Sequence, residues 1–257
     1  MIWWRCILSN EYMNSSAIIF FYFLLVVVAF LYSAVGHGGA SGYLALMSLF
    51  LFGQEEMRPT ALLLNLVVSF ISFVQYYRGG HFKWSLFWPF ALASVPAAFL
   101  GGQISIDSGL YKKILGVLLF LSVIRLTGIR IKTSVPDVKQ HLSLALIIGA
   151  SIGFVSGLIG IGGGIILSPV IMLLNWADIK QTSAVSALFI FVNSLAGLGG
   201  LFSKGFYLEP GFALMAGLAL LGGVAGSYFG ASRLKPIYLQ RLLAFVLLIA
   251  SIKLIFV

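Results

Sequence analysis

The chain has very few charged residues. Asp, Glu, Lys and Arg make up 9% of its 257 residues, whereas soluble domains carry roughly a quarter. A soluble globular domain is therefore excluded. Hydrophobic residues make up 60% of the sequence, in runs long enough for helices that cross a hydrocarbon core of about 30 Å. Transmembrane β-strands alternate apolar and polar residues, and the run from Phe20 to Leu31 does not. The chain is predicted to be an all-α polytopic membrane protein.

The sequence also has little cysteine, and its apolar runs contain no acidic residues. Cys6 is the single cysteine, which rules out an intrachain disulfide and argues against a metal site built from cysteines. The acids fall at the ends of apolar runs or between them, so we expect no carboxylate inside the membrane to relay protons; they are Glu11, Glu55, Glu56, Asp107, Asp137, Asp178 and Glu209. The sequence contains no Ser–His pair, carboxylate pair or His–Glu metal pattern of the kind found in enzymes. It also contains no phosphate-loop motif of the kind found in ATPases. We predict no catalytic activity, no cofactor and no metal.

The net charge of +9 would suggest nucleic acid as a partner of a soluble protein. No basic run here is interleaved with aromatic residues, so nucleic-acid binding is rejected. Lys and Arg are instead expected in loops that face the anionic cytoplasmic leaflet.

The apolar runs form two series of five with a polar stretch between them, which indicates an internal repeat. The text from Gly36 to Ser41, GHGGAS, corresponds to GIGGGI from Gly160 to Ile165, and further matches follow in the same order. The predicted division is an N-terminal segment (1–16), a first transmembrane repeat (17–126), a cytoplasmic linker (127–140) and a second transmembrane repeat (141–257).

The first two runs of each series are interpreted as a hairpin. Residues 17–52 would form one helix of roughly 54 Å, too long for an ordinary crossing, and Tyr43–Phe52 alone is too short to span. A hairpin returns to the side it entered, so the three crossings that follow would invert the second half relative to the first. This topology places the linker and most Lys and Arg residues on the cytoplasmic face, with Arg58 among the fewer cations on the other face.

Some small and aromatic residues are expected to serve structure. Glycines that recur every four residues predict close helix packing; they are Gly149, Gly153, Gly157, Gly222, Gly226 and Gly230. Trp84, Trp88 and Trp176 lie near the ends of runs, where aromatic residues meet the membrane surface.

The glycines between the two members of each hairpin predict the functional site. They are Gly36, Gly38 and Gly39 in the first half and Gly160, Gly162, Gly163 and Gly164 in the second. Backbone that leaves helical geometry inside lipid must be buried in protein or line a wet cavity, and broken helices at corresponding positions of two repeats point to a midplane binding site. The helices that follow are expected to begin near Tyr43 and Ile165 and to direct their N-terminal amides at an anion. Close packing is the alternative role of these glycines.

The second turn lies in the text Gly157-Leu-Ile-Gly-Ile-Gly-Gly-Gly-Ile-Ile-Leu-Ser-Pro, which is followed by Thr182-Ser-Ala-Val-Ser and Lys204-Gly-Phe. This pattern resembles the signature of the TauE/SafE membrane transporters, the sulfite-exporter or sulfonate-permease family. The resemblance covers nearly the whole chain and implies transport of a small sulfur-containing anion such as sulfite, sulfoacetate or an organosulfonate. In the first half His37 replaces Ile, and Ala40 replaces the last Gly, so we expect the two turns to differ in role.

Polar side chains within the apolar runs complete the predicted site, because they are costly in lipid and generally face the bundle interior. Neutral hydroxyls and amides can bind an oxyanion, and helix-to-helix hydrogen bonding is their alternative role. Beside the glycines of the turns, the predicted substrate-binding residues are His37, Ser41, Asn65, Ser168, Thr182, Ser183, Ser186 and Asn193. His37 is the titratable group in the first turn, so it is a candidate anion ligand or proton-coupling group, with a structural role as the alternative.

These patterns predict a secondary transporter in the cytoplasmic (inner) membrane of a bacterium. It would move a small sulfur-containing anion by alternating access to a midplane site between the turns. An anion channel and a non-transporting membrane assembly partner would share the turns and the polar lining, so both alternatives stay open. The expected partners are the small anionic substrate and the lipid bilayer, and a homo-oligomer is compatible with the sequence.

Overall fold

The computed structural model describes residues 15–34, 36–50, 52–128, 140–203, 205, 211–232 and 236–256. Within these ranges the chain forms ten α-helices. They are α2 (Ser15–Ala34), α3 (Ala40–Leu49), α4 (Gln54–Arg78), α5 (Trp84–Gln103), α6 (Ser108–Gly128), α7 (Leu142–Ile159), α8 (Gly164–Leu173), α9 (Ile179–Phe202), α10 (Phe212–Ser232) and α11 (Pro236–Phe256). The all-helical prediction is confirmed for this part of the chain. The predicted N-terminal segment and linker fall mostly outside it and stay predictions.

Among the residues that the structure describes, six helices are long and apolar enough to cross a membrane: α2, α4, α5, α7, α9 and α10. Large apolar side chains such as Phe23, Leu92 and Leu221 are exposed on their outer faces, as lipid contact requires. Helix α6 is also 21 residues long but carries Lys112, Lys113 and Arg125. The chain is therefore a multi-pass integral membrane protein.

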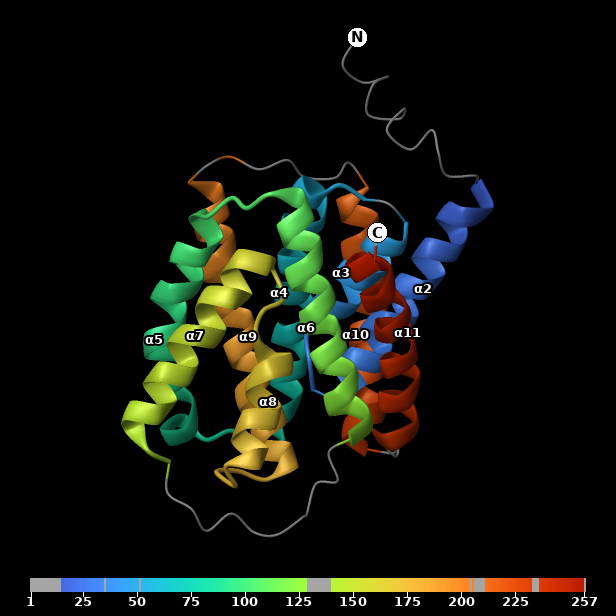
Figure 1. Cartoon of the computed structure of the whole chain (residues 1–257). Helices are drawn as coiled ribbons and strands as arrows, with labels where there is room; N and C mark the ends of the chain where they lie inside the picture. Colours follow the sequence, from blue (N-terminus) through green and yellow to red (C-terminus); the bar gives the residue numbers. More distant parts are fainter. Residues whose placement is uncertain are drawn as a thin grey trace.

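The two predicted hairpins enter the bundle from opposite ends. Helix α3 ends near the start of α4 and of α6, at the end of the bundle that we call the Lys112 end. Helix α8 ends near Trp176, which packs against Phe90 of α5 with ring centroids 5.9 Å apart. This is the opposite end, which we call the Trp84 end (Figure 1). The short helices are ten residues each and begin at Ala40 and Gly164, so α3 starts three residues before the expected Tyr43.

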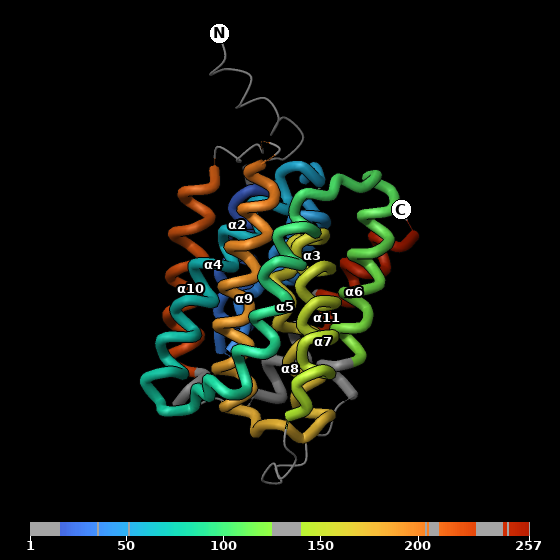
Figure 2. Tube along the Cα trace, turned by 90° about the vertical axis from the view of Figure 1, so that its left-hand side faces the viewer, coloured from blue at the N-terminus to red at the C-terminus, as the bar shows by residue number. Residues whose placement is uncertain are grey.

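Helices of one half pack on helices of the other in a reciprocal pattern. Helix α7, the first of its half, lies along α5, the fourth of the other half, and α2 lies along α10 in the same way. The third helices, α4 and α9, pack together in the centre, and the fifth helices, α6 and α11, pair at the side (Figures 1 and 2). Each half therefore completes its packing only with the other.

The regularly spaced glycines bring these helices into close contact. A Cβ atom on Gly149, Gly153 or Gly157 would collide with the backbone of α5, and one on Gly222 or Gly226 with the backbone of α2. The packing role is confirmed for these five, and the surroundings of Gly230 lie outside the described residues. Trp84 and Trp88 are exposed, but Trp176 is buried. The belt position expected for Trp176 is wrong, because its ring fills the space between α8 and α5.

Candidate functional site

Glycines with left-handed backbone form both hairpin turns. In the first turn Gly36 has φ 78° and Gly39 has φ 98°; in the second, Gly160, Gly162 and Gly163 have φ 89°, 71° and 78°. Residues with a Cβ rarely adopt such angles. Gly39 and Gly163 are the N-cap residues of α3 and α8. The sequence therefore turns sharply at these glycines and restarts a short helix inside the bundle.

Both turns meet at one side chain, Asn65 of α4. Its Oδ1 accepts a hydrogen bond from the backbone N–H of Ala40 at 3.2 Å, and its Nδ2 donates to Ser194 Oγ at 2.9 Å. A Cβ atom on Gly38 would collide with the Asn65 Oδ1, and one on Gly162 would collide with its Nδ2. The amide is thus wedged between the first turn, on its oxygen side, and the second turn, on its nitrogen side.

The Ser168 hydroxyl of α8 joins the first turn to the second half of the chain. Ser168 Oγ of α8 lies 2.9 Å from His37 Nε2 and 2.8 Å from Ser186 Oγ of α9. It also donates to the backbone oxygen of Gly164 at 2.9 Å. His37 therefore reaches out of its own hairpin, and three of the predicted site residues form one buried cluster.

Ser183 lies against the start of the first turn. A Cβ atom on Gly36 would come within 2.6 Å of the Ser183 Cβ, and the Ser183 side chain hydrogen-bonds Tyr76 of α4. One helical turn before Ser186, α9 thus contacts the same turn that His37 belongs to. Gly164 packs against Ile190 of α9, and Gly163 against Ile152 and Phe189.

The structure does not bring every predicted residue into this cluster. The Ser41 hydroxyl bonds to Tyr32 within the first hairpin at 2.7 Å. Asn193 donates to Phe189 of its own helix at 2.8 Å. The Asn193 Oδ1 and the Thr182 hydroxyl are buried without a hydrogen-bond partner among the described residues. Gly160 packs on Arg58 rather than on Asn65.

Arg58 lies at the end of the bundle opposite the linker, as expected, but no sequence pattern indicated that its side chain is buried. It is 5% exposed and lies inside α4. It donates to the backbone oxygen of Gly157 from Nε at 3.1 Å and from Nη2 at 2.6 Å, and Nη2 also lies 2.9 Å from the oxygens of Gly101 and Gly102. A guanidinium can be buried here because the last carbonyls of α5 and α7 lack helical partners and attract positive charge. Beside it is a hollow of about 540 Å³ at the Lys112 end.

Ser194 and Tyr76 were also missed. Ser194 binds Asn65, whereas the neighbouring Asn193, which we had expected in the site, bonds within its helix. Adjacent helical residues point about 100° apart, so a run of polar residues does not say which one faces the turns. Tyr76 lies near the end of α4, where an aromatic residue is expected at the membrane surface.

The arrangement gathers hydroxyl, amide and imidazole groups beside the two turns. Asn65 and Ser168 are each 1% exposed and His37 is 7% exposed, so the cluster is buried away from the surface of the bundle. Among the described acids, Glu55, Asp107 and Asp178 are exposed and Glu56 is half-buried. Hydroxyl, amide and imidazole groups therefore meet helix N-termini without a described carboxylate that would repel an anion.

Comparison with known proteins identifies the family of the chain. A family model described as sulfite exporter TauE/SafE matches residues 21–254. A curated protein of Sinorhizobium fredii named "Probable membrane transporter protein" is 38% identical over 233 residues, which cover 89% of this chain and 94% of that protein. A protein of Methanocaldococcus jannaschii with a similar name is 27% identical over 142 residues, 54% of this chain and 53% of that protein. No solved structure matches the chain.

Proposed function

Since the chain belongs to the TauE/SafE family of sulfite exporters and is a membrane transporter, we propose that it moves a small sulfur-containing anion by alternating access to the space between its two glycine turns. The substrate class is that of sulfite, sulfoacetate or an organosulfonate. The observation that carries this proposal is the convergence of both turns on Asn65.

The chemistry of the turns supports an anion. Helices α3 and α8 begin at the turns, and the first amides of a helix carry partial positive charge. The backbone N–H of Ala40 already points at the Asn65 oxygen, and an oxyanion could replace that acceptor. Ser186 would supply a hydroxyl donor, Ser168 would supply one by giving up its bond to the Gly164 carbonyl, and His37 would supply a ring N–H when its tautomer or charge allows.

The packing between the halves supports alternating access. The hairpins enter from opposite ends, and their glycine-lined contacts, α7 on α5 and α2 on α10, lie between the halves. Small residues allow such helices to shift against each other without interdigitated side chains to separate. A shift at one contact would open the turns toward the Lys112 end, and a shift at the other would open them toward the Trp84 end.

The test is flux through proteoliposomes at two pH values, with sulfite, sulfoacetate, taurine and thiosulfate as substrates. We expect saturable flux of at least one of these compounds and its competition by another. Flux that rises linearly with concentration and voltage would instead identify a channel. No flux of any of them would contradict the proposal and favour an assembly role.

Two asparagine variants connect this flux to the turns. Asn65→Asp keeps the size of the side chain and can still accept from Ala40 and Ser194, but it places a carboxylate between the turns. We expect it to abolish anion flux while the purified protein stays monodisperse. The control is Asn193→Ala, which removes an amide that bonds only within its helix and should retain flux. Wild-type flux in Asn65→Asp would move the site away from the turns.

A further inference from the structure

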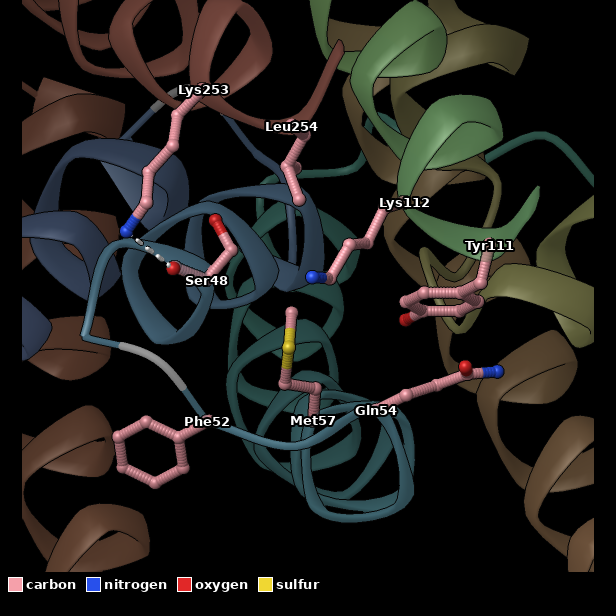
Figure 3. A pocket seen from close by; sticks show the side chains of 8 residues that line it. All are labelled: Ser48, Phe52, Gln54, Met57, Tyr111, Lys112, Lys253 and Leu254. Carbon is pink, nitrogen blue, oxygen red and sulfur yellow. Dashed lines mark hydrogen bonds between the residues drawn. The ribbon is translucent and has the colours of Figure 1, made fainter. Parts of the chain in front are cut away.

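A smaller hollow at the Lys112 end lies apart from the turns. It has a volume of about 120 Å³ and is lined by Ser48, Phe52, Gln54, Met57, Tyr111, Lys112, Lys253 and Leu254. We call it the lysine hollow. Its walls come from α3, α4, α6 and α11, that is, from both halves of the chain (Figure 3).

Two ammonium groups face the lysine hollow. Lys253 donates to the last carbonyls of α3, Ser48 at 3.1 Å and Leu49 at 3.0 Å, which leaves one of its three N–H groups. Lys112 reaches in from α6 with its ammonium turned toward the centre of the hollow (Figure 3), and no described residue accepts a hydrogen bond from it. The two charges repel each other, and none of the eight residues that line the hollow is acidic.

The remaining wall is largely apolar. Phe52, Met57, Leu254 and the Tyr111 ring contribute apolar surface, and Gln54 contributes an amide. Two cations beside apolar side chains suit an oxyanion carried on a short hydrocarbon body better than a fully hydrated inorganic ion, because the hydrocarbon part gains from leaving water.

Tyr111 connects the lysine hollow to the second turn. Its hydroxyl donates to the backbone oxygen of Ile159 at 3.0 Å, and Ile159 is the last residue of α7 before the turn. Met57, on the opposite wall, is followed by Arg58, which packs on Gly160. An occupant of the hollow would therefore lie one side chain away from the turn.

We propose that the lysine hollow is a second anion-binding site, in which Lys112 and Lys253 hold the sulfonate or similar oxyanion group of a small organic anion beside Phe52, Met57 and Leu254. The identification of this ligand with the transported anion rests on the proposed function. A phospholipid headgroup carries the same chemistry, an oxyanion on an apolar chain, so the experiment separates the two sources.

The experiment measures binding of ethanesulfonate to purified protein by calorimetry, in detergent and in phosphatidylcholine nanodiscs with and without phosphatidylglycerol. The key variant is Lys112→Gln, because Lys112 makes no contact that folding needs. We expect binding about fivefold weaker, as for loss of one charge-assisted contact at a partly exposed site. The matched control is Lys113→Gln, which removes the same charge from the next residue of α6; both lysines are exposed, but Lys113 does not line the hollow. It should bind as the wild type does, and Lys112→Arg should restore binding.

Equal affinity in Lys112→Gln and wild type, or an equal loss in Lys113→Gln, would overturn the proposal. If phosphatidylglycerol binds in a Lys112-dependent way and ethanesulfonate does not, the hollow is a lipid site. The proposal that it binds a small organic anion would then be wrong. Binding requires no transport, so the two proposals fail separately. If no anion is transported, the transport proposal fails while the hollow still binds; if flux is normal without Lys112-dependent binding, only the second site fails.

Discussion

The two glycine turns share one position in the bundle but differ in what they offer a ligand. Gly38 and Gly162, at corresponding places, both pack on Asn65. One residue earlier the turns diverge: His37 bonds Ser168 of the other half, whereas Ile161 lies in the apolar core with Met57 and Ile165. The two turns thus share the contact with Asn65 and differ in the side chain that precedes it.

The basic residues that follow the two turns in the sequence, Arg58 and Lys180, also differ in their surroundings. Arg58 is buried and holds the ends of α5 and α7, whereas Lys180, its counterpart before the third run of the second half, is exposed. The second turn is therefore anchored by a buried charge next to Gly160, and the first turn has no such anchor among the described residues. The first turn is held instead by the Ala40–Asn65 and His37–Ser168 hydrogen bonds.

Gly162→Ala is expected to have the largest effect of the variants considered. The new methyl group would meet the Asn65 amide, and the backbone angle of 71° would strain it. Strain costs about 1–2 kcal/mol and overpacking about 1–3 kcal/mol more, so we expect little folded protein. The measurement is the yield of monodisperse protein and its thermal midpoint in detergent.

Two other glycine variants separate the effect of backbone strain from that of the collision with Asn65. Gly80→Ala has the same strain, at φ 73°, with nothing within 4 Å, and should lower the midpoint only slightly. Gly38→Ala has the collision with Asn65 without a positive φ, and should fall between the two. If Gly80→Ala were as damaging as Gly162→Ala, the contact with Asn65 would not be what the second turn requires.

The sequence was sufficient to predict the short helices and the glycine turns, but not the contacts that they make with other helices. The run lengths predicted a short second member in the first hairpin, because ten residues cannot span lipid, although α3 begins at Ala40 rather than near Tyr43. The glycine pattern identified both turns, and the cost of polar groups in lipid identified Asn65, Ser168 and Ser186. The hairpin topology assigned Arg58 to the face opposite the linker, but it did not predict that the guanidinium is buried. Its partners are backbone carbonyls contributed by other helices, which no side-chain pattern records.

His37→Ala tests whether the first turn carries the chemistry. It removes the bond to Ser168 and leaves buried hydroxyls with fewer partners, which costs about 1–3 kcal/mol. If this bond forms in the transporting state, flux should fall roughly tenfold and its dependence on pH should change. The measurement is initial flux in proteoliposomes across pH 5.5 to 8.

The matched change on the second turn is Ile161→Val, which shortens a buried side chain and costs about 0.5–1.5 kcal/mol of stability. We expect it to keep the wild-type pH profile and most of the flux. His37→Gln should retain part of the rate, since an amide can bond Ser168, but not the pH response. If the His37→Ala protein had wild-type flux at every pH, His37 would have only a structural role. The two turns would then not differ in their contribution to transport.

Thr182→Val should give the smallest effect and the finest test of the comparison. Thr60 and Thr182 occupy corresponding places in α4 and α9, and both hydroxyls are buried without a hydrogen-bond partner among the described residues. Valine has nearly the same shape, so neither change should lower the thermal midpoint, and loss of an unsatisfied hydroxyl would raise it slightly. If Thr182 donates to the anion, Thr182→Val raises KM about threefold, while Thr60→Val leaves KM unchanged. An equal rise in both variants would mean that the halves contribute alike to binding, and that their asymmetry is confined to His37 and Arg58.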